Sequence, residues 1–129
     1  GASALVLVSD EYAAANGLDA PVSVTGTGPG TDRMALADRT DLARTPAAAD
    51  AATTAYDDAG LGPADVDLAE VHDCFTIAEV LAIESLGFAD PGEGIGAARD
   101  GRTTADGDIP VNLSGGLKAK GHPVGATGG

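Results

Sequence analysis

The order of hydrophobic and polar positions predicts three short strands in the first half of the chain. Residues 4–8 (ALVLV) form a continuous apolar run, which is typical of a strand buried on both faces. Residues 22–25 (VSVT) alternate and predict a second strand, and residues 67–71 (DLAEV) predict a third. Between the first two strands, residues 11–16 are expected to form one helical turn that Gly17 ends.

Longer helices are predicted on either side of the third strand. Thr45 suits the N-cap position and Pro46 the first helical position, and Gly60 ends this helix. The next helix is expected to begin at Thr76, which has the capping-box spacing from Glu79. The apolar face of this second helix is formed by Ile77, Val80, Leu81 and Ile83.

The other segments are expected to be mainly loops. Residues 26–30 (GTGPG) predict a tight turn rather than a nucleotide-binding loop, because the spacing is GxGxG rather than GxGxxG and no Walker lysine is present. A short helix is expected near residues 34–37, and a long polar loop with one turn inside it over residues 89–108. Residues 109–129 are expected to hold one strand at most, followed by glycine-rich loop and a helix start near Thr127. Alternating strands and helices predict the α/β fold class.

The charge of the chain limits its partners. The 20 acidic and 7 basic residues give a net charge of −13, which would repel nucleic acid and anionic membranes. A scattered acidic surface favours a protein that works in high salt, where self-repulsion is screened. An ordinary acidic cytosolic protein is the alternative. The scattered acids include Asp10, Glu11, Asp19, Asp57, Asp58, Asp65, Asp67 and Glu70.

Length and composition indicate one domain in the cytoplasm. A chain of 129 residues suits a single domain, and its one cysteine excludes an internal disulfide. No stretch approaches the roughly 20 apolar residues of a membrane span. The start lacks the basic region of a signal peptide. The chain also opens without Met and stops inside a glycine-rich motif, so we expect it to be a fragment of a longer protein.

One histidine and the only cysteine lie together in the stretch EVHDCFTIAEV. His72 and Cys74 are two positions apart, so on an extended segment they point to the same side. They directly precede a predicted helix, whose N-terminal partial charge favours a thiolate. A neighbouring imidazole could accept the thiol proton. Taken alone, the pair is equally consistent with an activated thiol and with a buried structural cysteine beside a satisfied histidine.

The second histidine favours the chemical interpretation. His122 lies in GLKAKGHPVGATGG, where glycines allow backbone amides to approach a ligand closely. Such amides can bind an oxyanion or a phosphate. A surface histidine in a mobile loop is the alternative. Metal binding is a weaker alternative, because His72, Cys74 and His122 provide three ligands at most and no CxxC or HExxH motif is present.

These motifs resemble the thiolase superfamily. VHDCF and NLSGGLKAKGHPVGATG are similar to the sterol-carrier-protein-type thiolases and to archaeal acetyl-CoA acetyltransferases. GASALVLVSDEYA and GTGPGTDRMALADRTD resemble other parts of the C-terminal half of that family. The resemblance implies a layered αβαβα thiolase fold, with residues 1–129 as an incomplete C-terminal domain. It also implies acyltransfer on acyl-CoA thioesters, either condensation to acetoacetyl-CoA or thiolytic cleavage of a 3-ketoacyl-CoA.

The resemblance implies a role for each motif residue. The stretch from His72 to Phe75 takes the place of an Asn-Glu-Ala-Phe motif, so His72 would contribute to an oxyanion hole. Cys74 would be the acid/base. His122 would activate the nucleophilic cysteine and contribute to the oxyanion hole. The loop residues expected near the substrate, without a catalytic part, are Asn112, Ser114, Gly115, Gly116 and Gly125.

The acylated cysteine is expected outside this chain, in the N-terminal half of the family. The fragment alone should therefore be inactive. The family implies no cofactor beyond the coenzyme A of the substrate. It implies a homo-oligomer, with a small zinc-ribbon/OB-fold protein and hydroxymethylglutaryl-CoA synthase as partners. A non-catalytic thiolase-like scaffold that binds acyl-CoA or lipid is the alternative function.

Overall fold

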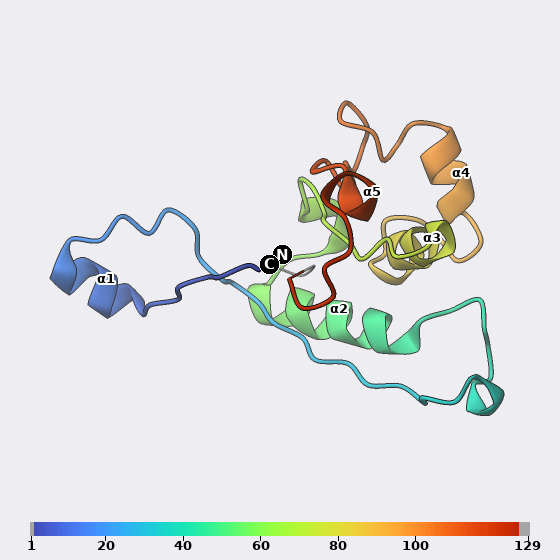
Figure 1. Cartoon of the computed structure of the whole chain (residues 1–129), viewed down its shortest axis with the longest axis horizontal. Helices are drawn as coiled ribbons and strands as arrows, with labels where there is room; N and C mark the ends of the chain where they lie inside the picture. Colours follow the sequence, from blue (N-terminus) through green and yellow to red (C-terminus); the bar gives the residue numbers. More distant parts are fainter. Residues whose placement is uncertain (1, 127–129) are drawn as a thin grey trace.

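The computed structural model describes residues 2–126. Figure 1 shows a group of helices from α2 onward, with the N-terminal segment and α1 extending away from it. The α-helices are α1 (Asp10–Asn16), α2 (Pro46–Ala59), α3 (Thr76–Ser85), α4 (Gly94–Arg99) and α5 (Gly116–Lys120). Two 3₁₀ turns, η1 (Leu36–Asp38) and η2 (Pro63–Asp65), lie between them.

The first two helices confirm the sequence-based expectation. In α1 the Tyr12 backbone N–H donates to the Ser9 hydroxyl, and Gly17 ends the helix at φ 62°. In α2 Pro46 occupies the first turn and Gly60 ends the helix at φ 68°. The N-cap expectation for Thr45 is only half right, because its side chain makes no cap hydrogen bond. Its hydroxyl instead contacts the Ser85 hydroxyl on α3.

The capping box predicted for α3 is wrong. The N-cap residue is Phe75, which has no side-chain cap hydrogen bond, and Thr76 is already helical. The helix still buries part of its expected apolar face. Ile83 is 1% exposed, whereas Ile77 is 56% exposed and points away from the core. Glu79 is therefore free of a capping role.

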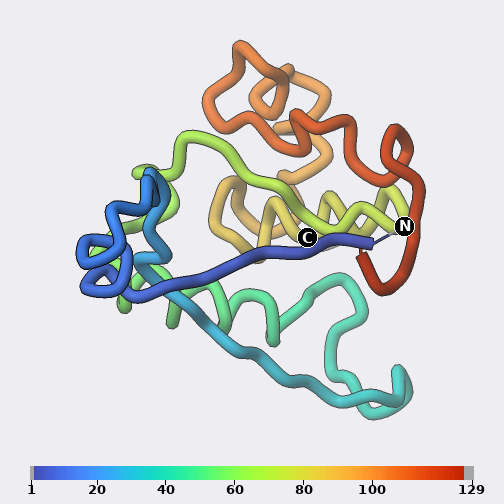
Figure 2. Tube along the Cα trace, turned by 60° about the vertical axis from the view of Figure 1, so that its left-hand side comes forward, coloured from blue at the N-terminus to red at the C-terminus, as the bar shows by residue number. Residues whose placement is uncertain are grey.

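The two strands predicted at residues 4–8 and 22–25 are wrong, since neither segment is a strand in the structure. Val6 is 89% exposed and Val22 is 84% exposed. A strand is stabilised by a paired neighbour, and within residues 2–126 no named strand lies beside either segment. Figure 2 shows the chain before α1 running extended across the molecule. The apolar pattern therefore identified segments suited to a sheet that the described residues do not form.

The third predicted strand is reduced to one parallel bridge, between Ala69 and Val111. It is the isolated bridge recorded in the described part of the chain, so the layers of an α/β fold are not formed there. The bridge nevertheless joins two segments about 40 residues apart in the sequence, 67–71 and 109–112. These are the segments that precede the two histidine motifs.

The tight turn predicted at residues 26–30 is also wrong. This segment runs along α2 without a turn, and alternate glycines meet helix carbonyl oxygens (Figure 1). A Cβ added at Gly28 would lie 1.9 Å from the Ala51 oxygen. Two extended residues and four helical residues both advance about 6–7 Å, which keeps the contacts in step. The three pairs are Gly26 with Ala55, Gly28 with Ala51 and Gly30 with Ala47.

The hydrophobic core lies under α3 and α4. The expected loop over 89–108 contains α4 and contributes to this core, because Ala97 is 3% exposed. Arg102 holds the same region together, donating to the Phe88 carbonyl (3.2 Å) and to Asp108 (3.1 Å). No helix in residues 2–126 has the length and apolar character needed to cross a membrane. The core cluster is Ile83, Phe88, Ala89, Ala97, Ile109 and Val111.

Candidate active site

Backbone hydrogen bonds bring the two histidine motifs side by side. The Ala69 N–H donates to the Pro110 carbonyl at 2.9 Å, and the Asn112 N–H donates to the Ala69 carbonyl at 2.8 Å. The Asn112 side chain continues this pairing, since its Oδ1 accepts the Val71 N–H at 2.8 Å. The two segments are therefore in register just before the residues expected to carry chemistry.

Two carboxylates extend the pairing into the histidine motifs. The Glu70 carboxylate accepts the Ser114 backbone N–H at 2.9 Å and the Ser114 hydroxyl, and it lies 3.6 Å from the Lys120 ammonium. The Asp73 carboxylate accepts the Leu117 N–H, at 3.0 Å to one oxygen and 3.2 Å to the other. Glu70 and Asp73 flank His72, so these bonds hold the loop after residue 112 against the segment that carries His72.

Gly116 fits closely under the Asp73 carboxylate. Its φ of 59° lies in the left-handed region, which favours glycine. A Cβ at this position would lie 2.2 Å from Asp73 Oδ2. A side chain here would therefore meet both backbone strain and a steric clash with the group that positions α5.

The two histidine rings are in contact. The centroids of His72 and His122 are 5.0 Å apart, and the ring planes make an angle of 75° in an edge-to-face arrangement. The histidines are 50 residues apart in sequence, so the contact depends on the pairing of the two segments. Gly121, at φ 78°, ends α5 and turns the chain directly before His122.

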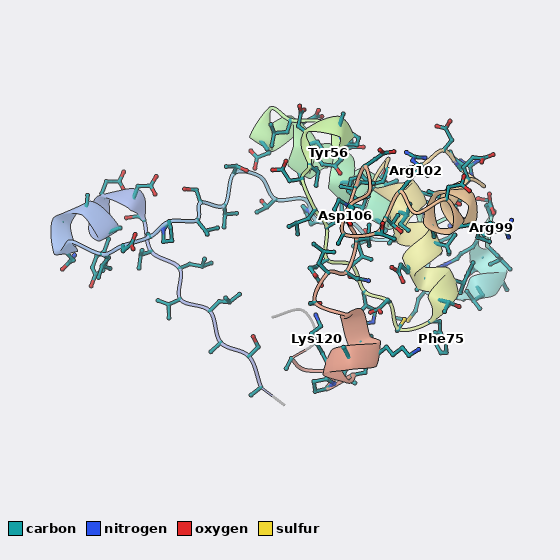
Figure 3. All side chains as sticks on the ribbon, turned by 90° about the horizontal axis from the view of Figure 1, so that it is seen from above. Tyr56, Phe75, Arg99, Arg102, Asp106 and Lys120 are labelled. Atoms are coloured by element: carbon teal, nitrogen blue, oxygen red, sulfur yellow. The ribbon has the colours of Figure 1, made fainter. Side chains whose placement is uncertain are left out.

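Cys74 and His122 line a common open hollow of about 710 Å³. Cys74 is a free, exposed thiol. His72 lies beside the hollow through its contact with His122. Figure 3 shows Phe75 and Lys120 on the side of the molecule where α5 lies, away from Tyr56. The lining residues are Asp73, Cys74, Phe75, Thr76, Glu79, Val111, Asn112, Gly115, Leu117, Lys118 and His122.

A second cavity, of about 290 Å³, lies between the start of α2 and α3. It is lined by residues such as Thr45, Leu81 and Pro91 and contains neither histidine nor a thiol. It therefore lacks the groups that proton transfer or nucleophilic chemistry would use, and the hollow beside Cys74 is the candidate active site.

Two acids near the site have shifted pKa values, in opposite directions. The pKa of Glu70 is lowered, first by the hydrogen bond from the Ser114 hydroxyl and then by the Ser114 backbone N–H. The pKa of Glu79 is raised, first by burial of its carboxyl group and then by the negative charge of Asp73. The Asn112 side chain opposes this rise and lowers the pKa of Glu79. The environment at Glu70 thus favours a carboxylate, and that at Glu79 disfavours one.

The structure brings most of the expected site residues together. The expected catalytic residues His72, Cys74 and His122 meet at one hollow, and the expected substrate-binding residues Asn112 and Gly115 line it. The other two expected substrate-binding residues differ. The Ser114 hydroxyl is hydrogen-bonded to Glu70, and Gly125 is not among the lining residues of the hollow. The helix start expected near Thr127 lies outside the described residues.

Sequence reasoning missed three carboxylates of this site. Glu70 counted only as one of the scattered surface acids, Asp73 only as a motif letter, and Glu79 only as a capping residue. Two of these acids lie next to chemical residues in the sequence, and that proximity was the available signal. Their partners lie more than 40 positions away, so the sequence did not indicate what they bind. Within residues 2–126, no three His, Cys, Asp or Glu side chains gather in a way that would hold a metal ion.

Comparison with known families identifies relatives of nearly the whole chain. The family model described as thiolase C-terminal domain-like matches residues 28–128. An acetyl-CoA acetyltransferase of Methanothermobacter thermautotrophicus is 51% identical over 128 residues, which cover 99% of this chain and 33% of that protein. Sterol carrier protein 2 of Rattus norvegicus is 36% identical over 132 residues, covering 99% and 24%. The chain thus spans about a quarter to a third of the length of these relatives.

Similarity to a solved structure extends to the fold. The structure titled "Ltp2-ChsH2(DUF35) aldolase" matches with a TM-score of 0.67 and 28% sequence identity, covering 71% of this chain and 25% of that one. The benzoylsuccinyl-CoA thiolase subunit BbsB of Thauera aromatica is 38% identical over 132 residues, with 99% of this chain and 33% of that protein covered.

Proposed function

Because the chain belongs to the thiolase C-terminal domain-like family, whose model matches residues 28–128, we propose that the full-length protein is an acyltransferase acting on acyl-CoA thioesters. The observation that carries this proposal is the contact between the His72 and His122 rings beside the exposed Cys74 thiol. It is supported by relatives named acetyl-CoA acetyltransferase and benzoylsuccinyl-CoA thiolase subunit. The similar structure titled an aldolase is a reminder that a fold supports more than one reaction.

Condensation of two acetyl-CoA molecules is the reaction assigned to this site. One acetyl group is carried as a thioester on a cysteine outside residues 1–129. Cys74, as thiolate, takes a proton from C2 of the second acetyl-CoA, and the enolate carbon attacks the carried acetyl carbonyl. The bond to the carrier cysteine breaks, and that cysteine leaves as a thiolate while acetoacetyl-CoA forms. Thiolytic cleavage of a 3-ketoacyl-CoA uses the same steps in reverse.

The two histidines stabilise the oxygen on which negative charge develops. A ring N–H from His72 donates to the enolate oxygen of the acetyl acceptor. His122 activates the carrier cysteine and donates to the same oxyanion site. Donors fixed before the reaction stabilise the transition state because they need no reorganisation when the charge develops. The carboxylates of Glu70 and Asp73 hold the two histidine segments in the register that this task requires.

The full-length protein is assigned the layered αβαβα thiolase arrangement. Its support here is the family membership together with the apolar runs at residues 4–8 and 22–25, which have the composition of buried strands and lie exposed within the described residues. Strand partners for these runs would come from chain beyond residues 1–129, which the relatives possess.

The test of the function uses full-length protein with Cys74→Ala. Exchange of the C2 protons of acetyl-CoA with solvent should be lost, because the base is absent. Transfer of the acetyl group to the carrier cysteine should remain partly intact, because that half-reaction does not use the Cys74 thiol. The exposed Asp90→Ala substitution, away from the hollow, serves as the control. Normal exchange in the Cys74→Ala protein would exclude Cys74 as the base.

A second candidate is a non-catalytic scaffold that binds acyl-CoA or lipid. It is favoured by the relatives named sterol carrier protein 2. The two candidates differ in the carrier cysteine, which only the enzyme needs. Full-length protein that binds acyl-CoA but acquires no acetyl group on any cysteine would support the scaffold.

The partners of the enzyme follow from the same relatives. The similar solved structure names a DUF35 protein beside Ltp2 in its title, which supports a partner protein for the full-length enzyme. We assign it a small zinc-ribbon/OB-fold protein and hydroxymethylglutaryl-CoA synthase as partners, a homo-oligomeric state, and no cofactor beyond the coenzyme A of its substrate. Copurification from the native source, followed by mass spectrometry, tests these assignments.

A further inference from the structure

Glu79 is a carboxyl group at the candidate active site to which the proposed reaction gives no part. It lies on the first turn of α3, five residues after Cys74, and lines the same hollow as Cys74 and His122. The helix does not use it as a cap. Acidic groups face it across the hollow through Asp73, and Lys118 is the basic residue among the lining side chains. A partly buried carboxyl group without a structural task is unusual enough to require a reason.

Asn112 is held in one orientation beside this carboxyl group. Within residues 2–126 it is the one non-glycine residue with a positive φ, at 55°. Its backbone N–H donates to Ala69, its carbonyl accepts the Gly115 N–H at 2.9 Å, and its Oδ1 accepts the Val71 N–H at 2.8 Å. Flipping the amide would place an NH₂ group against the Val71 N–H, two donors facing each other. The orientation of Nδ2 is therefore fixed by its neighbours.

The Asn112 Nδ2 is buried and has no hydrogen-bond partner among the described residues. An unsatisfied buried donor is unfavourable, so native structures supply a partner for nearly all such groups. Because this atom is closed to solvent, a substrate entering the hollow does not reach it. The partner must therefore be a protein group, and the Glu79 carboxyl is the acceptor on which Asn112 already acts as a hydrogen-bond donor would.

We propose that Glu79 is a positioning residue of the active site, and that its carboxyl group accepts a hydrogen bond from Asn112 Nδ2 in the working enzyme. This bond ties the first turn of α3, which follows Cys74, to the segment that leads through α5 to His122. It fixes the separation of the thiol and the second imidazole. The proposal rests on the proposed function only for its kinetic consequences. The bond itself is a property of the folded chain.

The kinetic test uses full-length protein with Glu79→Ala, Glu79→Gln, Asn112→Ala and the double Ala variant. Each Ala single variant should lower kcat about tenfold or more, with KM for acyl-CoA changed less than about threefold, because alignment rather than binding is lost. The double variant should be no slower than the worse single variant, because both changes remove one bond. Glu79→Gln retains a carbonyl acceptor and should keep most of the activity. Glu93→Ala, an exposed glutamate on another element, is the matched control.

A second measurement separates this proposal from the proposed function. The rate at which iodoacetamide alkylates Cys74, followed by mass spectrometry of its peptide, should change alike in Glu79→Ala and Asn112→Ala, and no further in the double variant. A full-length protein without thiolase activity would overturn the proposed function, and the alkylation rates would still decide the role of Glu79. Additive effects of the two Ala changes, or a Glu79→Gln variant as slow as Glu79→Ala, would overturn the positioning role.

Discussion

Gly116→Ala should weaken the protein and its activity more than a glycine substitution of equal backbone strain. The added Cβ would lie 2.2 Å from Asp73 Oδ2, and the residue has φ 59°. Left-handed backbone costs a non-glycine residue about 1–2 kcal/mol. Displacing the Asp73 carboxylate from the Leu117 N–H adds about 1.5–3 kcal/mol for a hydrogen bond to a charged group. The expected total loss of stability is about 3–5 kcal/mol.

Gly60→Ala is the matched control for the strain. Gly60 has φ 68° at the end of α2, and a Cβ added there meets nothing within 4 Å. This variant should lose only the strain contribution, about 1–2 kcal/mol, and keep its kcat. Urea unfolding of the full-length protein, with kinetics on each variant, measures both effects.

The positions of the histidines make the activity loss the sharper observation. Moving Asp73 releases α5, and His122 follows α5 directly, so kcat of Gly116→Ala should fall about a hundredfold through lost alignment. Adding Asp73→Ala removes the clash and should return part of the stability but not the activity. If Gly116→Ala lost no more stability than Gly60→Ala and kept its kcat, the carboxylate would have no positioning role.

Three further outcomes are expected from the contacts of other residues. The pKa of Glu70 is lowered from 4.5 in the folded chain, so its stabilisation is present above the unfolded pKa and is lost as pH falls through the folded pKa; Glu70→Gln should flatten acid unfolding in that range. Gly28→Val should release residues 26–30 from α2, because its Cβ would lie 1.9 Å from the Ala51 oxygen, and proteolysis of that segment should increase while Gly125→Val has no such effect. Tyr56→Phe removes the hydroxyl that donates to the Leu86 carbonyl at 3.0 Å, and should cost about 1 kcal/mol in urea unfolding without changing kcat.

Local signals were read correctly where one or two residues decide the structure. Pro46 and Gly60 set the bounds of α2, and Gly17 ended α1, because the backbone freedom of these residues is a property of the residue itself. The choice between a turn and an extended segment at residues 26–30 was not local. Its glycines are needed by the carbonyl oxygens of α2, which lie about 20 residues further along the chain.

The strand expectations failed for a related reason. An apolar run records what a segment prefers to bury, whereas a strand also requires a partner for its backbone groups. Residues 4–8 carry the preference without a partner in the described chain. Residues 67–71 found a single bridge, and that bridge is what aligns the histidine motifs.

The sequence by itself determined which residues could perform chemistry. His72, Cys74 and His122 were recognisable from residue type, spacing and glycine context, and the metal alternative was weak from ligand count alone. Only the tertiary structure decided that the two histidine rings meet, and that Glu70, Asp73 and Glu79 belong to the site. The physical reason is that a carboxylate selects its partner by position in space, across more than 40 residues here. Neither composition nor periodicity records that distance.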